Sequence, residues 1–226
     1  MKKLLLLTMI LVSMVTNAQK DVTKFLGIPV DGTKSDMIIK LKAKGFKYNQ
    51  QQDILTGEFN GYNVKLLIAT YNNTVWRIAV VDAIDVSETD IRIRFNNLCG
   101  QFERNGKYVP YGGKDFSIPE EEDISYNMSV KNIRYEAVYL QLSKDKNKIK
   151  DEITDKLRNK YSDDDYNDPA KKEEIEEVAY SEASKVISEL YDPNKSVWFL
   201  INERFGRYSI TMYYDNEYNH SDGEDL

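Results

Sequence analysis

Apolar and polar residues alternate along three segments in the first part of the chain, as in strands that bury one face. The apolar positions are Leu55 and Phe59 in the first segment, Tyr62, Val64, Leu66 and Ile68 in the second, and Trp76, Ile78 and Val80 in the third. Asn60-Gly61 separates the first two and indicates a two-residue hairpin turn. A helix is predicted before them, because Thr33 can cap an apolar stripe that ends at Gly45. The pattern predicts a helix followed by an antiparallel meander.

The rest of the chain repeats this order with one interruption. A second helix is predicted to begin at Ser87, and its apolar stripe includes Cys99. A loop is expected over residues 105–122, which contain a glycine pair and a proline. Alternation predicts further strands at residues 124–130, 138–142, 197–202 and 207–214.

A charged segment, residues 143–192, interrupts the second series of strands. Ile149, Ile153 and Leu157 recur every four residues, and Asp168-Pro169 is typical of a helix cap followed by the first helical residue. We therefore predict a helical hairpin inserted between two strands.

Together these elements predict an α+β protein, in which helices cover an antiparallel sheet of about seven strands. The order of elements indicates two halves, residues 19–86 and 87–214, each a helix followed by a meander. The helical insertion at 143–192 belongs to the second half. Residues 215–226 are acidic and are expected to form a frayed tail.

The N-terminus has the pattern of a cleavable secretory signal. Lys2 and Lys3 precede an apolar run, residues 4–15, and Thr16-Asn17-Ala18 fits a cleavage site. We interpret residues 1–18 as the signal and residues 19–226 as a single domain. The run is shorter than the ~20 residues that span a bilayer, so an uncleaved anchor or a buried helix is the less favoured interpretation. No Cys follows to accept a lipid, which predicts a periplasmic or secreted bacterial protein without a lipid anchor.

Charge and cysteine content narrow the classes of partner. Without Lys2 and Lys3 the 31 basic residues fall to 29, against 37 acidic residues, which makes the net charge −8. This balance argues against binding to nucleic acid or to anionic membranes. No later segment is apolar enough for membrane insertion. The single cysteine, Cys99, cannot form an internal disulfide, which fits a bacterial periplasmic protein better than a small secreted eukaryotic domain.

One stretch carries a family resemblance. Phe25-Leu26-Gly27-Ile28-Pro29-Val30-Asp31-Gly32-Thr33, with the helix end Lys44-Gly45-Phe46, resembles small secreted proteins of Gram-negative anaerobes that have no assigned activity. Over residues 25–82 the helix-plus-meander pattern is similar to the repeat of the β-lactamase-inhibitor-protein-like fold and of the small outer-membrane assembly lipoproteins. The resemblance implies a role in binding proteins rather than in catalysis. The lipoproteins need an anchoring Cys that is missing here, and no functional residue is carried over.

Candidate catalytic residues are few. His220 is the only histidine and lies in the polar tail, which argues against Ser-His-Asp, Cys-His and His-ligated zinc chemistry. Cys99 lies on an apolar stripe, where a thiol behaves as a small inert hydrophobe. A carboxylate-dependent hydrolase of envelope or gut glycans stays open, because the ~5 to ~9.5 Å between its two carboxylates cannot be read from a sequence.

One acidic segment has the spacing of a calcium loop. Asp163, Asp165, Asn167 and Glu174 stand at positions 1, 3, 5 and 12 of an EF-hand-like loop between two predicted helices. The Gly that such a loop needs for its sharp turn is replaced by Asp168, which precedes a proline. Two interpretations stay open: a calcium-stabilised structural module, or an acidic loop in which Asp168 caps the next helix.

The chain contains 16 tyrosines, a residue type that is enriched at binding surfaces. Tyr208, Tyr213 and Tyr214 cluster near the end and are candidates for such a surface. Tyr208 and Tyr214 share one strand face with Ile210 and Met212, and Tyr213 points the other way. The alternative is that these are ordinary sheet residues whose rings pack. The preferred hypothesis is a non-catalytic protein that binds a protein or an envelope component, without a required cofactor.

Overall fold

The structure is a computed structural model that describes residues 20–220 of the chain. The predicted signal, its cleavage site and the end of the acidic tail lie outside these residues. The helices are α2 (Lys34–Ala43), α3 (Glu88–Arg104), α4 (Ile124–Ser129), α5 (Lys146–Lys160), α6 (Asp163–Asn167) and α7 (Pro169–Leu190), with the 3₁₀ turns η1 (Tyr111–Gly113) and η2 (Glu217–Asn219). Among the described residues, none of the helices combines the length and the apolar character needed to cross a membrane.

The predicted α+β class is confirmed, because these helices accompany an eight-stranded antiparallel sheet and a separate two-stranded hairpin. The large sheet has the order β3 (Lys47–Asn49), β4 (Ile54–Phe59), β5 (Tyr62–Tyr71), β6 (Thr74–Asp82), β10 (Arg207–Asp215), β9 (Ser196–Arg204), β8 (Glu136–Gln141) and β7 (Tyr108–Pro110). The hairpin consists of β1 (Lys24–Phe25) and β2 (Ile28–Pro29). The short strands β1, β2, β3 and β7 were not predicted from the sequence.

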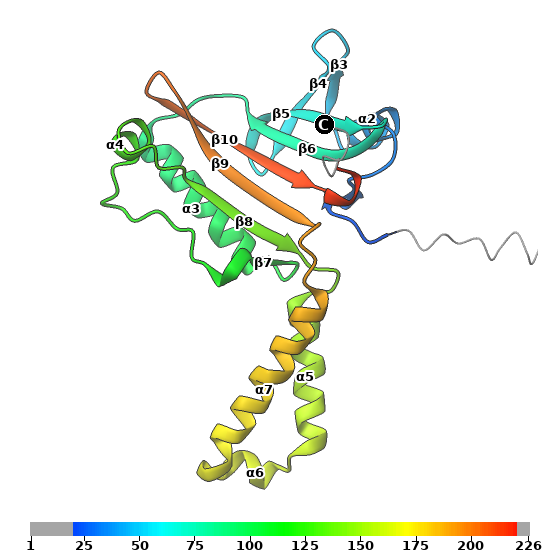
Figure 1. Cartoon of the computed structure of the whole chain (residues 1–226), viewed down its shortest axis with the longest axis vertical. Coiled ribbons are helices and arrows are strands. Elements are labelled where there is room, and N and C mark those ends of the chain that lie inside the picture. The colour runs from blue at the N-terminus through cyan, green and yellow to red at the C-terminus, as the bar shows by residue number, and fades with distance from the viewer. Residues whose placement is uncertain (1–19, 221–226) are drawn as a thin grey trace, which may run out of the picture.

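The order of elements occurs twice in the sheet. In the first half α2 precedes β3 to β6, and in the second half α3 precedes β7 to β10. Helix α4 is inserted before β8, and α5 to α7 are inserted before β9. Figure 1 shows the two halves meeting where their last strands, β6 and β10, pair at the centre of the sheet. The two meanders therefore form one continuous sheet.

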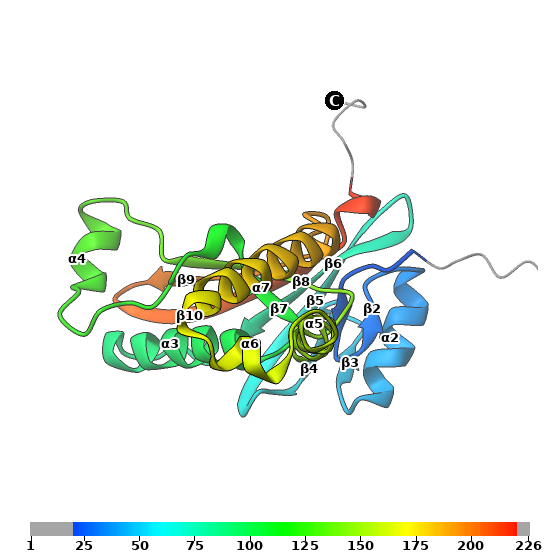
Figure 2. The same cartoon turned by 90° about the horizontal axis from the view of Figure 1, so that it is seen from below.

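The core lies between one face of the sheet and the helices α2 and α3, and Figure 2 shows α3 lying along the strands of the second half. Ser87 caps α3, since its hydroxyl accepts a hydrogen bond of 3.2 Å from the backbone N–H of Asp90. The predicted apolar stripe of α3 is buried and includes Cys99. Phe95 on this stripe packs edge-on against Phe199 of β9, with ring centroids 5.0 Å apart.

One charged residue of α3 is also buried and connects the two halves. The side chains of Arg94 and Asp82 are each only 6% exposed, and they form a two-point ion pair at 2.5 and 2.7 Å. The same Asp82 carboxylate accepts the backbone N–H of Ile210 at 3.0 Å. Asp82 lies at the end of β6 and Ile210 on β10, so the carboxylate links α3 to both central strands.

The helical insertion projects from the body as an arm formed by α5 and α7 with α6 between them (Figure 1). The arm has its own small core of Ile149, Ile153, Leu157, Tyr161 and Ile175. Asp168 caps α7 and Pro169 is its first residue, as the sequence predicted. The strands on either side of the arm, β8 and β9, are antiparallel neighbours.

The predicted strand at 124–130 is wrong, because residues Ile124–Ser129 form helix α4. Asp123 caps this helix by accepting the backbone N–H three residues further on, at 2.8 Å. Glu122 accepts a hydrogen bond of 2.7 Å from the side chain of Asn127, which is buried with Ile124 on one helical face. Hydrogen bonds accepted by the two preceding carboxylates thus favour a helix where alternation alone indicated a strand.

The acidic tail is not frayed from its start. Asp215 is the last residue of β10 and is 1% exposed. Asn216 is fully buried, and its side-chain amide donates a hydrogen bond of 2.8 Å to the carbonyl of Val30. Turn η2 follows and packs near β6. The described part of the tail is therefore anchored to the sheet.

Candidate functional site

The structure separates the three tyrosines that were assigned to a binding surface. Tyr208 and Tyr214 are only 2% and 6% exposed, because they share the buried face of β10 with Ile210 and Met212. Burial raises the pKa of Tyr214 well above its ordinary value. Their assignment to an exposed surface is therefore wrong, although the alternation placed them correctly on a common face. Tyr213 points the other way and is half-buried.

Tyr213 lies on the sheet face opposite to α2 and α3, which we call the open face. At its centre are Trp76, Arg77, Trp198 and Tyr213. The ring of Trp198 stacks on that of its cross-strand neighbour Tyr213, with centroids 4.3 Å apart. The guanidinium of Arg77 lies 4.6 Å from the ring centroid of Tyr213 and 4.3 Å from that of Trp76. The four side chains form one layer held by aromatic and cation–π contacts.

A buried carboxylate orients this layer. Asp215 accepts two hydrogen bonds from the guanidinium of Arg77, at 2.6 and 2.7 Å. It also accepts the indole N–H of Trp198 at 2.8 Å. A two-point pair of this kind fixes the plane of a guanidinium. The cation and the rings are therefore held in position before any partner arrives.

The only histidine extends the open face. The ring of His220 packs on Trp76 with centroids 4.2 Å apart, and its Nδ1 lies 3.5 Å from the carboxylate of Glu217. Burial, and next the charge of Asp215, raise the pKa of Glu217. His220 thus belongs to an aromatic stack at the edge of the open face.

The position of Trp76 corrects another prediction, which placed it with Ile78 on the buried face. The register of β5 against β6 shifts between Ala69 and Thr70, and this leaves Trp76 as the extra residue of a β-bulge. A bulge re-aims the side chains beside it, so that Trp76 and Arg77 are both half-buried while their neighbours are buried. Alternation alone cannot reveal such a shift.

Apolar side chains surround the aromatic layer on the open face. They are Leu67, Ala69, Ala79, Val81, Val138 and Leu200, which the strand registers place on the same side as Tyr213. Leu67 is 44% exposed. The registers also place Lys65, Thr211 and Glu136 on this face, so apolar and polar side chains alternate around the layer. Trp, Tyr and Arg surrounded by such a mixed surface are typical of the sites where proteins bind one another.

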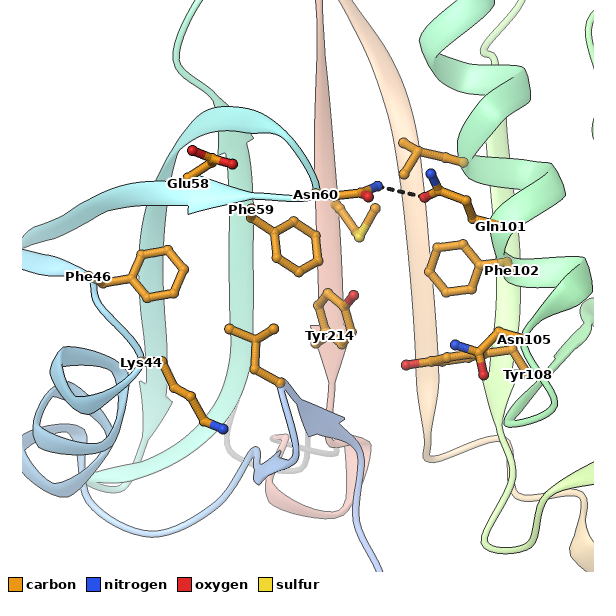
Figure 3. A pocket seen from close by; sticks show the side chains of 13 residues that line it. Lys44, Phe46, Glu58, Phe59, Asn60, Gln101, Phe102, Asn105, Tyr108 and Tyr214 are labelled. Atoms are coloured by element: carbon orange, nitrogen blue, oxygen red, sulfur yellow. Dashed lines mark hydrogen bonds between the residues drawn. The ribbon is translucent and has the colours of Figure 1, made fainter.

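A groove lies on the opposite, helix-bearing side of the sheet, between the two halves (Figure 3). It has a volume of about 480 Å³, and the rings that line it are Phe46, Phe59, Phe102, Tyr108 and Tyr214. The side-chain amide of Asn60 donates a hydrogen bond of 2.6 Å to Gln101, which connects the β4–β5 turn to α3 across the groove. The volume is within the range of small-molecule sites, and the walls combine these rings with polar side chains.

Cys99 lies on the buried face of α3 and is fully buried. Burial raises the pKa of its thiol to about 12. A raised pKa disfavours the thiolate, which is the nucleophilic form of cysteine.

The four proposed calcium ligands are not gathered into one loop. Asp163, Asp165 and Asn167 lie on the short helix α6, and Glu174 lies on α7. A hydrogen bond from Lys171, followed by bonds from Ser162, lowers the pKa of Asp165 to about 2. Within residues 20–220, no cluster of three or more His, Cys, Asp or Glu side chains is placed to hold a metal ion. The predicted loop is wrong because a capped helix occupies the segment, and calcium binding stays a prediction.

Comparisons with known proteins leave the family open. No family model, curated protein or solved structure matches the chain. The resemblance to the β-lactamase-inhibitor-protein-like fold therefore stays a prediction, and only the geometry of the chain bears on its function.

Proposed function

We propose that the chain is a non-catalytic binding protein, periplasmic or secreted, whose open face receives a protein partner. The observation that carries this proposal is the layer of Trp76, Arg77, Trp198 and Tyr213 on a sheet face that is not covered by α2 and α3. Tryptophan, tyrosine and arginine contribute most of the binding energy in protein interfaces. Export is inferred from the signal pattern of residues 1–18.

The physical support is preorganisation. Binding orders flexible side chains at a cost of about 0.5–1.5 kcal/mol each. Arg77 and Trp198 are already held by Asp215, and Tyr213 is stacked on Trp198. A partner that covers this layer therefore gains contact area with little loss of side-chain entropy.

The test is capture of partners from envelope extract by immobilised chain 19–226, followed by measurement of affinity for the recovered protein. Tyr213→Ala and Leu67→Glu change the open face but keep both hydrogen-bonding groups of the Arg77–Asp215 pair. We expect each to weaken binding about tenfold or more. Ile39→Glu is the matched control, because Ile39 is 65% exposed on α2, on the other side of the sheet. Equal affinity of all variants would place the interface elsewhere.

A carboxylate-dependent glycan hydrolase is the competing class from the sequence. Turnover of an envelope or gut glycan by the chain, abolished by a single Asp or Glu substitution that leaves the fold intact, would replace the binding proposal. Capture of a glycan instead of a protein, lost in Tyr213→Ala, would keep the open face as the site and change the class of partner.

A further inference from the structure

The groove of Figure 3 continues into a second hollow of about 380 Å³. The two hollows share Leu26, Phe59, Asn105, Tyr108 and Tyr214, so they adjoin along this section. The shared section is lined mainly by rings and by the side chain of Leu26, whereas the far end of the second hollow is polar. An apolar section that leads to a polar end suits a flexible alkyl chain with a polar head group.

Leu26 lies over this shared section in an unfavourable backbone conformation. It has φ 51° and precedes Gly27, with φ 79°, in the turn between β1 and β2. The β4–β5 turn has nearly the same angles, but Asn60, which tolerates them, occupies the position of Leu26. Leu26 is also 39% exposed. What distinguishes Leu26 from other residues with a positive φ is that it lines both hollows.

The second hollow has one more basic than acidic side chain, although the protein as a whole has a net charge of −6. Its charged side chains are Asp21, Lys24, Lys107, Asp145 and Lys195. Asp21 pairs with Lys195 at 2.5 Å and with Lys24 at 3.0 Å, and Asp145 caps α5. Despite the opposing effect of burial, these hydrogen bonds hold the pKa of Asp21 well below its usual range. Within the described residues, Lys107 is left without an ion pair and is exposed at this end of the groove.

From these three observations we infer that the groove binds a long-chain carboxylate. The alkyl chain lies between the aromatic walls and beneath Leu26, and the carboxylate lies beside Lys107. The groove is on the helix-bearing side of the sheet, so this site is independent of the open face and of the function proposed for it.

The first experiment is titration calorimetry of the chain with dodecanoate and with dodecylammonium, below their micelle concentrations. The two probes have the same alkyl chain and opposite charge. We expect saturable binding of one dodecanoate, with affinity rising up to about fourfold per methylene across a series from octanoate to dodecanoate. Lys107→Glu should remove the preference for dodecanoate over dodecylammonium. Failure of dodecanoate to bind, or equal binding of both probes by the unaltered chain, would overturn the inference.

The second experiment uses the strain at Leu26. Leu26→Asn should raise the melting temperature, because Asn tolerates a positive φ, and should weaken dodecanoate binding about tenfold. Phe205→Asn is the matched control, since Phe205 has φ 52°, precedes Gly206 in the β9–β10 turn and is 91% exposed. It should also raise the melting temperature but leave binding unchanged. Unchanged binding in Leu26→Asn would show that Leu26 has no role in a ligand site.

A third variant separates groove binding from general adsorption. Gln101 is exposed at the rim of the first hollow, and Gln101→Trp places an indole in it without changing the core. We expect dodecanoate binding to fall at least tenfold, while the melting temperature stays within a few degrees of that of the unaltered chain. Undiminished binding in this variant would mean that dodecanoate adsorbs elsewhere, and would overturn the assignment to the groove.

Discussion

At the scale of single residues, Asp215 determines the geometry of the open face. Its buried carboxylate has three donors from two side chains, Arg77 and Trp198. Thr23 adds a short hydrogen bond to its backbone carbonyl. The residue therefore connects the N-terminal segment, β6, β9 and β10 at one point.

Asp215→Asn tests this role. The neutral amide keeps the shape but weakens the two charge-assisted hydrogen bonds from Arg77, so we expect a loss of about 2 kcal/mol in the free energy of unfolding. The fluorescence of Trp198 should also change, because its indole N–H loses a charged acceptor. Urea unfolding followed by tryptophan emission measures both effects. Asp85→Asn, at an exposed position, is the control and should leave both unchanged.

At the scale of elements, the Arg94–Asp82 pair should determine how firmly α3 holds the two halves together. Arg94→Met leaves a buried carboxylate with only the N–H of Ile210 as a donor. Removing one partner of a buried ion pair costs about 3–5 kcal/mol, and we expect a loss in this range. The double variant Arg94→Met with Asp82→Asn should recover at least half of it, because Asn still accepts from Ile210 and carries no charge. Chemical denaturation of the single and double variants measures these changes in the free energy of unfolding. If the double variant recovers none of the loss, the lost packing of the Arg94 side chain, and not the unpaired charge of Asp82, causes it.

The arm should be dispensable for the fold of the body. Its core is separate from the main core, and the strands that flank it, β8 and β9, are antiparallel neighbours. Replacing residues 146–190 with a short Gly/Ser linker closes a shorter loop and keeps Lys195 and Ser143. Circular dichroism should show less helix, and the near-ultraviolet bands of the two tryptophans, which both lie outside the arm, should be unchanged. Loss of these tryptophan bands would show that the arm stabilises the sheet.

Calcium binding by the α6 segment has a direct test. The carboxylate of Asp165 accepts a hydrogen bond from the backbone N–H of Ser162 and pairs with Lys171. Because these partners already occupy the carboxylate, we expect calcium to leave the melting temperature of the chain unchanged. If calcium instead raises it as the ligand-linkage relation requires, and Asp163→Ala abolishes the effect, the segment rearranges into the loop that the sequence spacing indicates.

Local signals account for the elements that the sequence predicts correctly. Asn60-Gly61, Ser87 and Asp168-Pro169 each determine a turn or a helix start within a few residues, and the structure has each of them. The alternation at residues 124–130 predicted a strand wrongly, because the pattern of apolar residues carries no information about the hydrogen bonds that Glu122 and Asp123 accept from α4. The short edge strands have too few residues for a recognisable period.

The candidate sites were harder to predict, because they depend on contacts between distant segments. Alternation placed Tyr208 and Tyr214 on one face, but it cannot say which face the helices cover. The layer on the open face joins Arg77 to Asp215 across 138 positions of sequence. The groove exists only because the two halves pair through β6 and β10. No local pattern contains this information.

At the scale of the whole molecule, the central strand β10 serves both surfaces. Tyr213 and Tyr214 are consecutive, and they point to the open face and into the groove respectively. The strand alternation therefore places a proposed protein-binding face and a proposed ligand groove back to back. Both lie at the junction of the two halves, where residues from each half are needed to complete them.

The buried tyrosines should make the whole fold sensitive to alkaline pH. Burial raises the pKa of Tyr135 to about 12, and it also raises the pKa of Tyr139 and Tyr214 above the ordinary value. An unfolded tyrosine ionises near pH 10, so above that pH the unfolded chain loses protons that the folded chain retains. The free energy of unfolding should therefore be steady below about pH 10 and fall as the pH rises further, by up to about 1.4 kcal/mol per pH unit for each such tyrosine.

Urea unfolding across an alkaline pH series, with tyrosinate absorbance recorded in parallel, measures this slope. Tyr214→Phe should make it shallower, because it removes a buried titrating group. Tyr126→Phe, at a position that is 49% exposed, is the control and should leave the slope unchanged. If all the tyrosines ionise near pH 10 without loss of stability, the rings must reach water in the native state. The dependence is expected because burial in the core disfavours the charged tyrosinate and so keeps those hydroxyls protonated in the folded chain.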